Sequence, residues 1–274
     1  GGPLYTLYKA LHTVRLAARL AAETGRNVCP LFWVASDDHD FEEVGALGIR
    51  RRDGLPSKLH VTPGGYREGM PVGDIICDDE ITVTLDELAE SVPPGDAGER
   101  YMGLLRECWV PGVSWCDAFA RQMLGMLDEW GLIVFDPRWD GAKTLFAGIM
   151  RAELEDPETS AALVNDEADS FESARLRKRA LRRPEGATNL FLEQDGIRDA
   201  IYRDHDGYRA GDRSFSREEL SGLFERDPSA FSPGAALRPV CQDAAIPVAA
   251  LIGGPGERLY LSQLGPLYRH FGIE

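Results

Sequence analysis

The chain is short of basic residues, of closely spaced cysteines and of long apolar runs. Its 30 Lys and Arg are outnumbered by 45 Asp and Glu, and a net charge of -15 argues against nucleic acid or an anionic membrane as a partner. The five cysteines are scattered and form no C-x-x-C pair, which excludes the common zinc and redox motifs and predicts reduced thiols in a cytoplasmic protein. No apolar run approaches the length of a membrane span.

The amino-terminal part predicts a helix followed by a buried strand. Apolar residues recur at helical spacing from Leu4 to Ala21, Pro3 suits the first helical position, and Gly25 supplies the stop. The near-continuous apolar run 28–35 then predicts a central parallel strand.

The same order of elements returns further along the chain. An apolar stripe over 119–130 predicts a second helix that ends at Gly131, and 132–135 predicts a second strand. A third strand is expected at 248–252, before a glycine-rich turn at 253–257 and a last helix. Repeated helix–strand units imply an α/β fold with a parallel sheet.

Two segments interrupt this pattern. Residues 157–232 carry hairpin turn signals and predict an inserted α+β subdomain, and a smaller insertion is expected at about 45–95. The core is therefore predicted to comprise 1–156 and 233–274. The basic run 175–183 within the insertion is interpreted as a solvated helix face rather than a nucleic-acid arm.

An acidic run, 36–43, follows the first predicted strand directly. Ligands of open parallel sheets bind at the carboxyl ends of strands, so this junction is the first place to expect chemistry. His39 stands between Asp38 and Asp40 and suits proton transfer, and the carboxylates suit Mg²⁺ held with ATP. The alternative is an acidic helix start capped by Asp37 or Asp38. A metal site built from protein ligands alone is not expected.

Four blocks of the sequence, at 2–9, 32–43, 237–243 and 253–257, resemble the bacillithiol biosynthesis cysteine-adding enzyme family. They read GPLYTLYK, FWVA with DHDFEE, LRP with QD, and GGP with E. The chain departs from the family at Gly45 and Ala46, where members usually have Asn-His, and at Asp37, where they have Glu.

The resemblance implies a Rossmann-like core similar to class I aminoacyl-tRNA synthetases and nucleotidylyltransferases, with connecting-peptide insertions. It also implies a preceding segment with the first core strand and a C-terminal coiled coil for homodimerisation, and both are expected to lie outside this chain. The implied activity is the ATP-dependent joining of L-cysteine to glucosaminyl malate. The alternatives are an adenylate-forming or nucleotidyl-transferring enzyme that uses another acceptor, and a non-catalytic nucleotide-binding fragment.

The resemblance and the residue chemistry together nominate three groups of site residues. The catalytic candidates are Lys9, Asp38, His39 and Asp40. The candidates for binding ATP are Gly1, Gly2, Tyr5, Thr6, Arg238, Gly253, Gly254 and Gly256. The candidates for binding substrate are Trp33, Gln242, Asp243 and Glu257, with Gln242 and Asp243 expected on a strand-to-loop turn. The ATP phosphates are expected at glycine-flanked helix starts, because these expose unpaired N–H groups.

Overall fold

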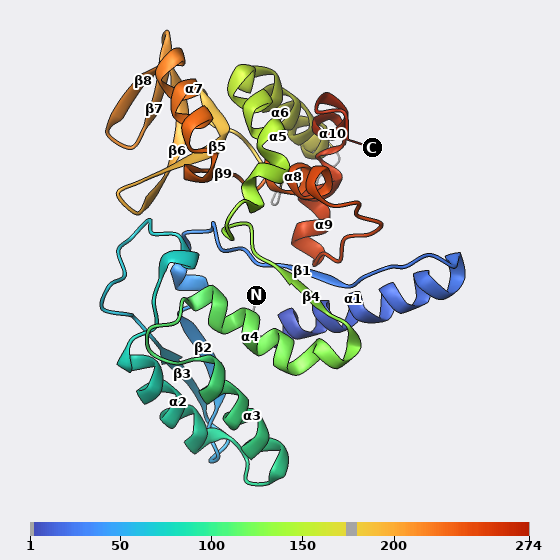
Figure 1. Cartoon of the computed structure of the whole chain (residues 1–274), viewed down its shortest axis with the longest axis vertical. Helices are drawn as coiled ribbons and strands as arrows, with labels where there is room; N and C mark the ends of the chain where they lie inside the picture. Colours follow the sequence, from blue (N-terminus) through green and yellow to red (C-terminus); the bar gives the residue numbers. More distant parts are fainter. Residues whose placement is uncertain (1–2, 174–179, 274) are drawn as a thin grey trace. The chain divides into compact units, whose positions relative to one another are not determined.

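A computed structural model describes residues 3–173 and 180–273 of the chain. It divides into two compact units of similar size, residues 1–137 (unit 1) and 138–274 (unit 2), whose elements are labelled in Figure 1. Within the described residues, no helix is both long enough and apolar enough to cross a bilayer.

Unit 1 combines helices with two small sheets. Its helices are α1 (Pro3–Thr24), α2 (Asp79–Ser91), α3 (Asp96–Cys108) and α4 (Trp115–Leu127), with single 3-10 turns η1 (Phe41–Glu43), η2 (Val72–Asp74) and η3 (Asp128–Trp130). Its strands are β1 (Leu31–Trp33), β2 (Ala46–Arg50), β3 (Pro56–His60) and β4 (Ile133–Phe135).

The predicted helix–strand units of unit 1 are present. Helix α1 ends at Gly25, whose φ of 68° is the left-handed conformation that glycine adopts without strain. Strands β1 and β4 pair in parallel, with Leu31 opposite Ile133 and Trp33 opposite Phe135. The parallel sheet expected from the sequence is confirmed for two of its three predicted strands, and β1 covers only three residues of the predicted 28–35.

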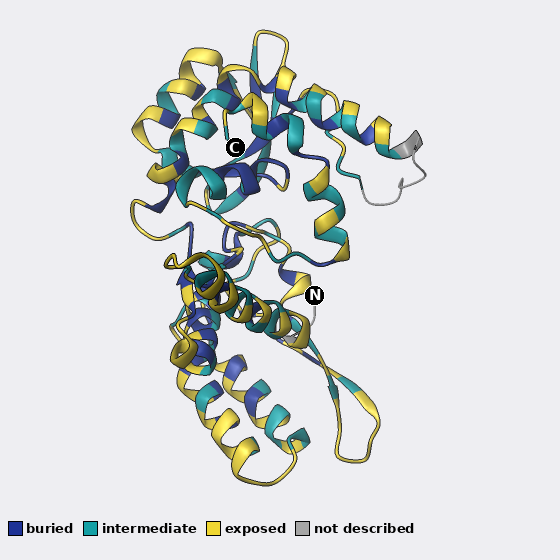
Figure 2. Ribbon diagram, turned by 90° about the vertical axis from the view of Figure 1, so that its right-hand side faces the viewer, coloured by how far each residue is buried: buried dark blue, intermediate teal, exposed yellow. Residues whose placement is uncertain are grey.

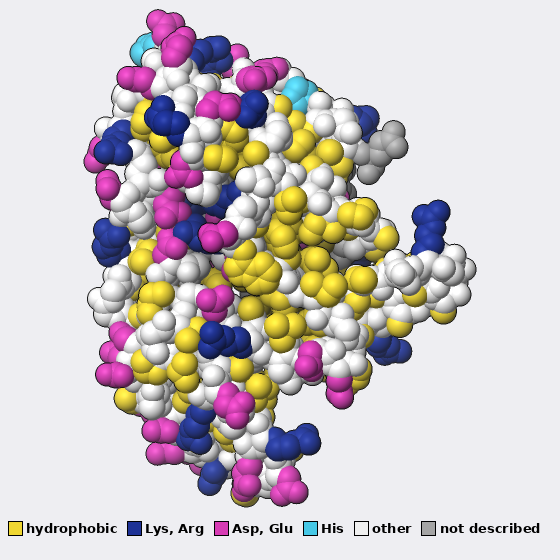
Figure 3. Space-filling view, in the orientation of Figure 1, with side chains coloured by type: hydrophobic (Ala, Val, Ile, Leu, Met, Phe, Trp, Pro, Cys, Tyr) yellow, Lys and Arg dark blue, Asp and Glu magenta, His cyan; other side chains and the backbone are white. Residues whose placement is uncertain are grey.

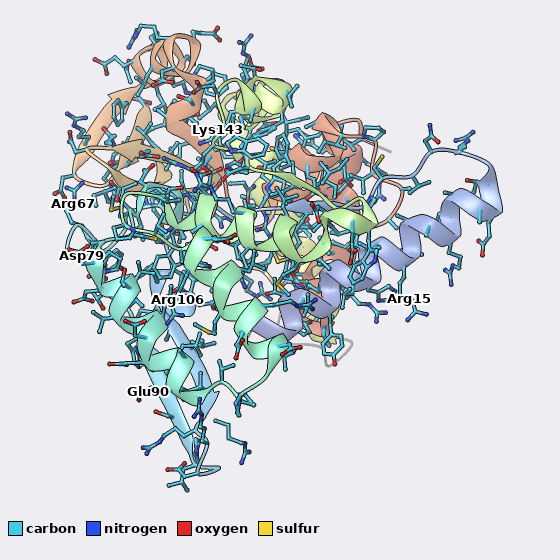
Figure 4. All side chains as sticks on the ribbon, turned by 60° about the horizontal axis from the view of Figure 1, so that its bottom comes forward. Arg15, Arg67, Asp79, Glu90, Arg106 and Lys143 are labelled. Atoms are coloured by element: carbon cyan, nitrogen blue, oxygen red, sulfur yellow. The ribbon has the colours of Figure 1, made fainter. Side chains whose placement is uncertain are left out.

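One core holds α1, α4, β1 and β4 together. Ala10 of α1, Val34 directly after β1, Val134 of β4 and Met123 of α4 are buried in a single apolar cluster. A smaller cluster joins α2 to α3 through Leu85, Met102 and Leu105. The tip of the β2–β3 hairpin is exposed (Figure 2). Arg106, labelled in Figure 4, links α3 to Asp86 of α2 by an exposed ion pair of 2.9 Å.

Unit 2 is built around a five-stranded antiparallel sheet of order β8-β7-β6-β5-β9. Its strands are β5 (Ala187–Gln194), β6 (Ile197–Asp204), β7 (Gly207–Ala210), β8 (Arg213–Ser216) and β9 (Phe231–Pro233). Its helices are α5 (Ala147–Glu155), α6 (Pro157–Ser173), α7 (Arg217–Arg226), α8 (Leu237–Ala245), α9 (Pro255–Ser262) and α10 (Gly265–His270), with 3-10 turns η4 (Ala142–Phe146) and η6 (Pro228–Ala230).

Two-residue turns connect the first hairpins of this sheet. Asp195 and Gly196 join β5 to β6 with φ values of 53° and 74°, the left-handed pair that a tight hairpin requires. The second turn uses His205 and Asp206, one residue earlier than the Asp206-Gly207 signal suggested, because Gly207 already pairs with Asp204 in the ladder.

Several expectations for unit 2 are wrong. Residues 248–252 form no strand: Leu251 is 48% exposed, and a strand needs a hydrogen-bonded neighbour that this segment lacks among the described residues. Gln242 and Asp243 lie in helix α8, not on a turn, because Pro239 falls in the first helical turn, where proline is tolerated. The last predicted helix is two helices, α9 and α10, and Gly256 lies inside α9.

The basic helix expected over 173–183 falls largely outside the described residues. Its described end, 180–183, is not helical. The backbone N–H of Leu181 instead donates to Gln263 Oε1 at 2.9 Å, and Asn165 exchanges hydrogen bonds of 2.8 and 3.0 Å with the backbone of Arg183. On the face shown in Figure 3, Lys and Arg lie among Asp and Glu rather than in one basic patch.

Candidate functional site

The acidic run lies where parallel sheets bind ligands, at the carboxyl ends of β1 and β4. The ladder continues past the strands, since Val34 N–H donates to the carbonyl of Phe135 at 2.9 Å. The chain then turns sharply, and Asp38 N–H donates to the carbonyl of Ala35 at 3.1 Å. We call residues 36–40 the acidic turn.

Two external contacts hold the backbone of the acidic turn. The N–H of Val72 donates to the carbonyl of Asp38 at 2.7 Å, and the N–H of Gly73 donates to the carbonyl of Ser36 at 2.9 Å. Both donors belong to the 3-10 turn η2. The segment is therefore held in one conformation although it is a loop, which is what a positioned functional group needs.

A buried side-chain hydrogen bond ties the acidic turn to β4. Ser36 Oγ donates to Asp136 Oδ1, and the two residues are 0% and 5% exposed. Asp37 is also buried, at 8% exposed. The sequence analysis did not nominate Ser36 or Asp136, although Asp136 follows the second predicted strand directly and so carries the signal that identified the first acidic junction.

The nominated residues of the acidic turn lie at its accessible side. Asp38 and Asp40 are exposed and His39 is half-buried. Asp38 Oδ1 accepts a hydrogen bond of 2.9 Å from the backbone N–H of His39. Among the described residues, no three His, Cys, Asp or Glu side chains converge as a metal site. The arrangement offers two carboxylates and an imidazole to a cationic or proton-bearing ligand.

The helix-cap interpretation of the acidic run is wrong. The run leads only into the three-residue turn η1, and Asp40 at its cap position makes no side-chain capping hydrogen bond. Residue 45, where the chain departs from the related family, is packed tightly: a Cβ on Gly45 would come within 2.7 Å of the Phe41 ring. A side chain at position 45 would therefore require Phe41 to move, so the glycine found here fits the local packing.

Trp33 and the residues of α1 complete the nominated set in unit 1. The ring centroids of Trp33 and Phe135 lie 4.5 Å apart, so these two side chains of neighbouring strands pack against each other. Lys9 Nζ lies 4.9 Å above the Tyr5 ring, one helical turn away, and Thr6 is half-buried. Gly1 and Gly2 lie outside the described residues.

Three of the nominated residues of unit 2, Arg238, Gln242 and Asp243, lie on α8. Arg238 donates to the hydroxyl of Tyr260 at 3.3 Å, and the hydroxyl of Tyr268 donates to Asp243 Oδ2 at 2.9 Å. Burial raises the pKa of Asp243, and the Tyr268 hydrogen bond partly offsets this. Gln242 is half-buried on the same helix. Arg238 therefore links α8 to α9, and Asp243 links α8 to α10.

A side-chain carboxylate already occupies the start of α9, next to the glycine turn at 253–254. Glu257 Oε2 accepts a hydrogen bond of 2.7 Å from the N–H of Gly254, the cap residue of the helix. This bond is half of a capping box; glycine has no side chain for the other half. A Cβ on Gly253 would approach that of Glu257 to 3.3 Å. A phosphate at this helix start would have to displace the Glu257 carboxylate, so the role of Gly253, Gly254 and Gly256 stays a prediction.

Comparison with known proteins gives one consistent result. The family model described as "Bacillithiol biosynthesis BshC, N-terminal Rossmann-like domain" matches residues 1–274. The protein named "Putative cysteine ligase BshC" of Salinibacter ruber is 36% identical over 281 residues, covering 100% of the chain and 50% of the relative. The proteins of the same name from Thermus thermophilus and Heliobacterium modesticaldum are 36% and 31% identical, with 52% and 50% of their lengths covered. The chain thus spans about half the length of the curated relatives it matches.

Proposed function

The chain belongs to the bacillithiol biosynthesis BshC family, as its N-terminal Rossmann-like domain, and we propose from this that it serves ATP-dependent joining of L-cysteine to glucosaminyl malate. The observation that carries the proposal is the match of the whole chain to that domain. The mixed α/β fold and the acidic turn at the carboxyl ends of β1 and β4 support it.

The reaction explains why ATP would be needed. A free carboxylate does not form an amide, because oxide is a poor leaving group and the negative charge repels an incoming amine. When the cysteine carboxylate attacks ATP, it displaces pyrophosphate from the α phosphorus or ADP from the γ phosphorus. One carboxylate oxygen then bridges carbon and phosphorus in a mixed anhydride, from which it can leave. The amine of the acceptor then forms the C–N bond and loses a proton, and that oxygen departs with AMP or with inorganic phosphate. Attack at the α or the γ phosphorus distinguishes these two routes.

The acidic turn has the groups that the amine step requires. An amine arrives as an ammonium ion, which the exposed carboxylates of Asp38 and Asp40 attract. It must lose a proton before it can attack, and the imidazole of His39 is a group of the turn that can accept it. Mg²⁺ bound to ATP would take most of its ligands from phosphate and water, and the same two carboxylates could supply the remainder.

The test is a reaction with the full-length protein. L-cysteine, glucosaminyl malate and ATP are incubated together, and the amide product is followed by mass spectrometry. We expect product only when all three are present, with AMP or ADP released in equal amount. Replacing L-cysteine by L-serine controls for selectivity toward the thiol. A folded protein that binds ATP but forms no amide would contradict the proposal and favour a nucleotide-binding module.

Lys9 is predicted to contribute to ATP binding. Lys9→Glu is expected to weaken ATP binding more than about tenfold, since a charge-assisted hydrogen bond to phosphate contributes roughly 1.5 to 3 kcal/mol. Isothermal titration measures this directly. Arg15→Glu is the matched control, because it makes the same charge reversal at an exposed position of the same helix (Figure 4). Equal affinities for ATP in parent and Lys9→Glu protein would place the phosphates elsewhere.

A further inference from the structure

We infer that Asp136 is a positioning residue, which acts through Ser36 to hold the acidic turn in its reactive conformation. The inference deepens the proposed function and rests on it, because it concerns the same site.

The geometry places Asp136 behind the acidic turn rather than beside a ligand. Asp136 is 5% exposed, and its Oδ1 accepts the hydrogen bond from Ser36 Oγ. Ser36 is 0% exposed, so a ligand has no access to the bond itself. The exposed members of the turn, Asp38 and Asp40, lie two and four residues further along the chain.

The hydrogen bond between Ser36 and Asp136, which we call the tie, matters because it adds a buried side-chain anchor to the two backbone contacts that hold the acidic turn. Strand β1 ends at Trp33, and the ladder to β4 ends with the bond from Val34 N–H to Phe135. Beyond that point Ser36 Oγ links the turn to Asp136, the residue that follows β4. A reacting group must be held within about half an ångström of its productive position, and small displacements cost up to about 100-fold in rate.

The hydrogen bond between Ser36 and Asp136 also supports the contacts between the acidic turn and η2. The carbonyl of Ser36 accepts from Gly73 N–H at 2.9 Å, and the carbonyl of Asp38 accepts from Val72 N–H at 2.7 Å. If Ser36 lost its side-chain anchor, both backbone bonds would open more often. Amide hydrogen exchange at Val72 and Gly73 therefore reports on the tie without any substrate.

Three variants distinguish positioning from direct chemistry. Ser36→Ala and Asp136→Ala remove the bond, whereas Asp136→Asn keeps an oxygen that can accept from Ser36 and removes only the charge. We expect Ser36→Ala and Asp136→Ala to speed exchange at Val72 and Gly73 by about tenfold or more. We expect the same two variants to lower kcat by about tenfold or more while KM changes less.

Asp136→Asn is the decisive variant. A positioning role predicts that its amide exchange and its kcat stay within about threefold of the parent. Asp117→Asn, at an exposed position of α4, is the matched control for removing one carboxylate from unit 1. Thermal unfolding of every variant establishes that it is folded at the assay temperature.

Two results would overturn the inference. An Asp136→Asn protein with parental exchange but with turnover as low as that of Asp136→Ala would show that the charge takes part in the chemistry. A Ser36→Ala protein with parental exchange and turnover would show that the tie positions nothing. If the parent forms no amide, the proposed function fails, and the exchange measurements alone still decide whether the tie holds the turn.

Discussion

Glu153→Gln is expected to stabilise the protein by about 3 kcal/mol at pH 8 and to change its stability little at pH 4. Glu153 lies on α5 in unit 2 and is 0% exposed. Its Oε1 accepts a hydrogen bond of 2.7 Å from the N–H of Asn189, but its Oε2 has no hydrogen-bond partner among the residues that the structure describes. Burial raises the pKa of Glu153 from 4.5 to about 7, although the neighbouring polar groups of Ser160 and Asn189 and the charge of Arg183 act in the opposite direction.

The direction of the effect follows from proton binding. Between pH 4.5 and 7 the folded state keeps the Glu153 proton and the unfolded state has lost it. The contribution of this group is therefore fully present below about pH 4.5 and is lost as the pH rises through about 7. Glutamine resembles the protonated acid and does not ionise. Its amide can also donate to Asn189 Oδ1, a buried acceptor that has no partner.

The surroundings of Glu153 support an uncharged carboxyl at low pH. The charged group that influences it is Arg183, from the segment before β5, and Glu153 in turn contributes to the raised pKa of Tyr208 on β7, which burial raises most. Arg183 Nε is itself buried without a partner, so it does not neutralise Glu153 through that atom. Tyr208 is engaged elsewhere, since its hydroxyl donates to the carbonyl of Leu154 at 2.6 Å.

Urea unfolding at several pH values measures the effect. The difference between Glu153→Gln and parent should grow from near zero at pH 4 to about 3 kcal/mol at pH 8. Glu155→Gln is the control, because it makes the same change at an exposed position two residues along α5. Parallel pH profiles for parent and Glu153→Gln would show that Glu153 is ionised in the folded state at neutral pH.

His39→Ala is expected to lower amide formation by about 100-fold to 10,000-fold, the usual contribution of a positioned acid or base. Thermal stability should change little, because His39 is only half-buried and belongs to no helix or strand. The measurement is product formation by full-length parent and variant at saturating cysteine and ATP. A loss that is concentrated in kcat and is relieved at high pH, where the amine is already deprotonated, would assign the proton-transfer role.

His12→Ala controls for histidine removal as such. His12 is exposed on α1, a position where alanine favours the helix, so activity and stability should both stay near the parent values. Turnover of His39→Ala at the parental rate would remove His39 from the mechanism. Equal losses in His39→Ala and His12→Ala would indicate a general effect on the fold instead.

Several elements could be predicted from residues that lie close together in the sequence. Helix α1, its glycine stop, the paired strands β1 and β4, and the hairpin from β5 to β6 are confirmed, because each depends on periodicity or on a turn residue within a few positions. Family membership was also evident from short motifs, and the match of the whole chain confirms it.

Tertiary structure decided what local patterns could not. Residues 248–252 are apolar enough for a strand, but a strand forms only where another offers backbone hydrogen bonds, and sequence periodicity does not reveal that neighbour. The capping bond from Gly254 to Glu257 likewise depends on the helix start that the fold selects.

In the candidate site, too, some features could be predicted from the sequence and others depend on the fold. The acidic residues at 37–40 could be nominated from the sequence, because they follow an apolar run directly. Their anchor could not, because Ser36 and Asp136 are 100 residues apart and meet only when β1 pairs with β4. The sequence by itself determined the chemistry available at the end of β1. The fold decided which of those groups are buried as supports and which remain open to a ligand, since burial depends on partners distant in the chain.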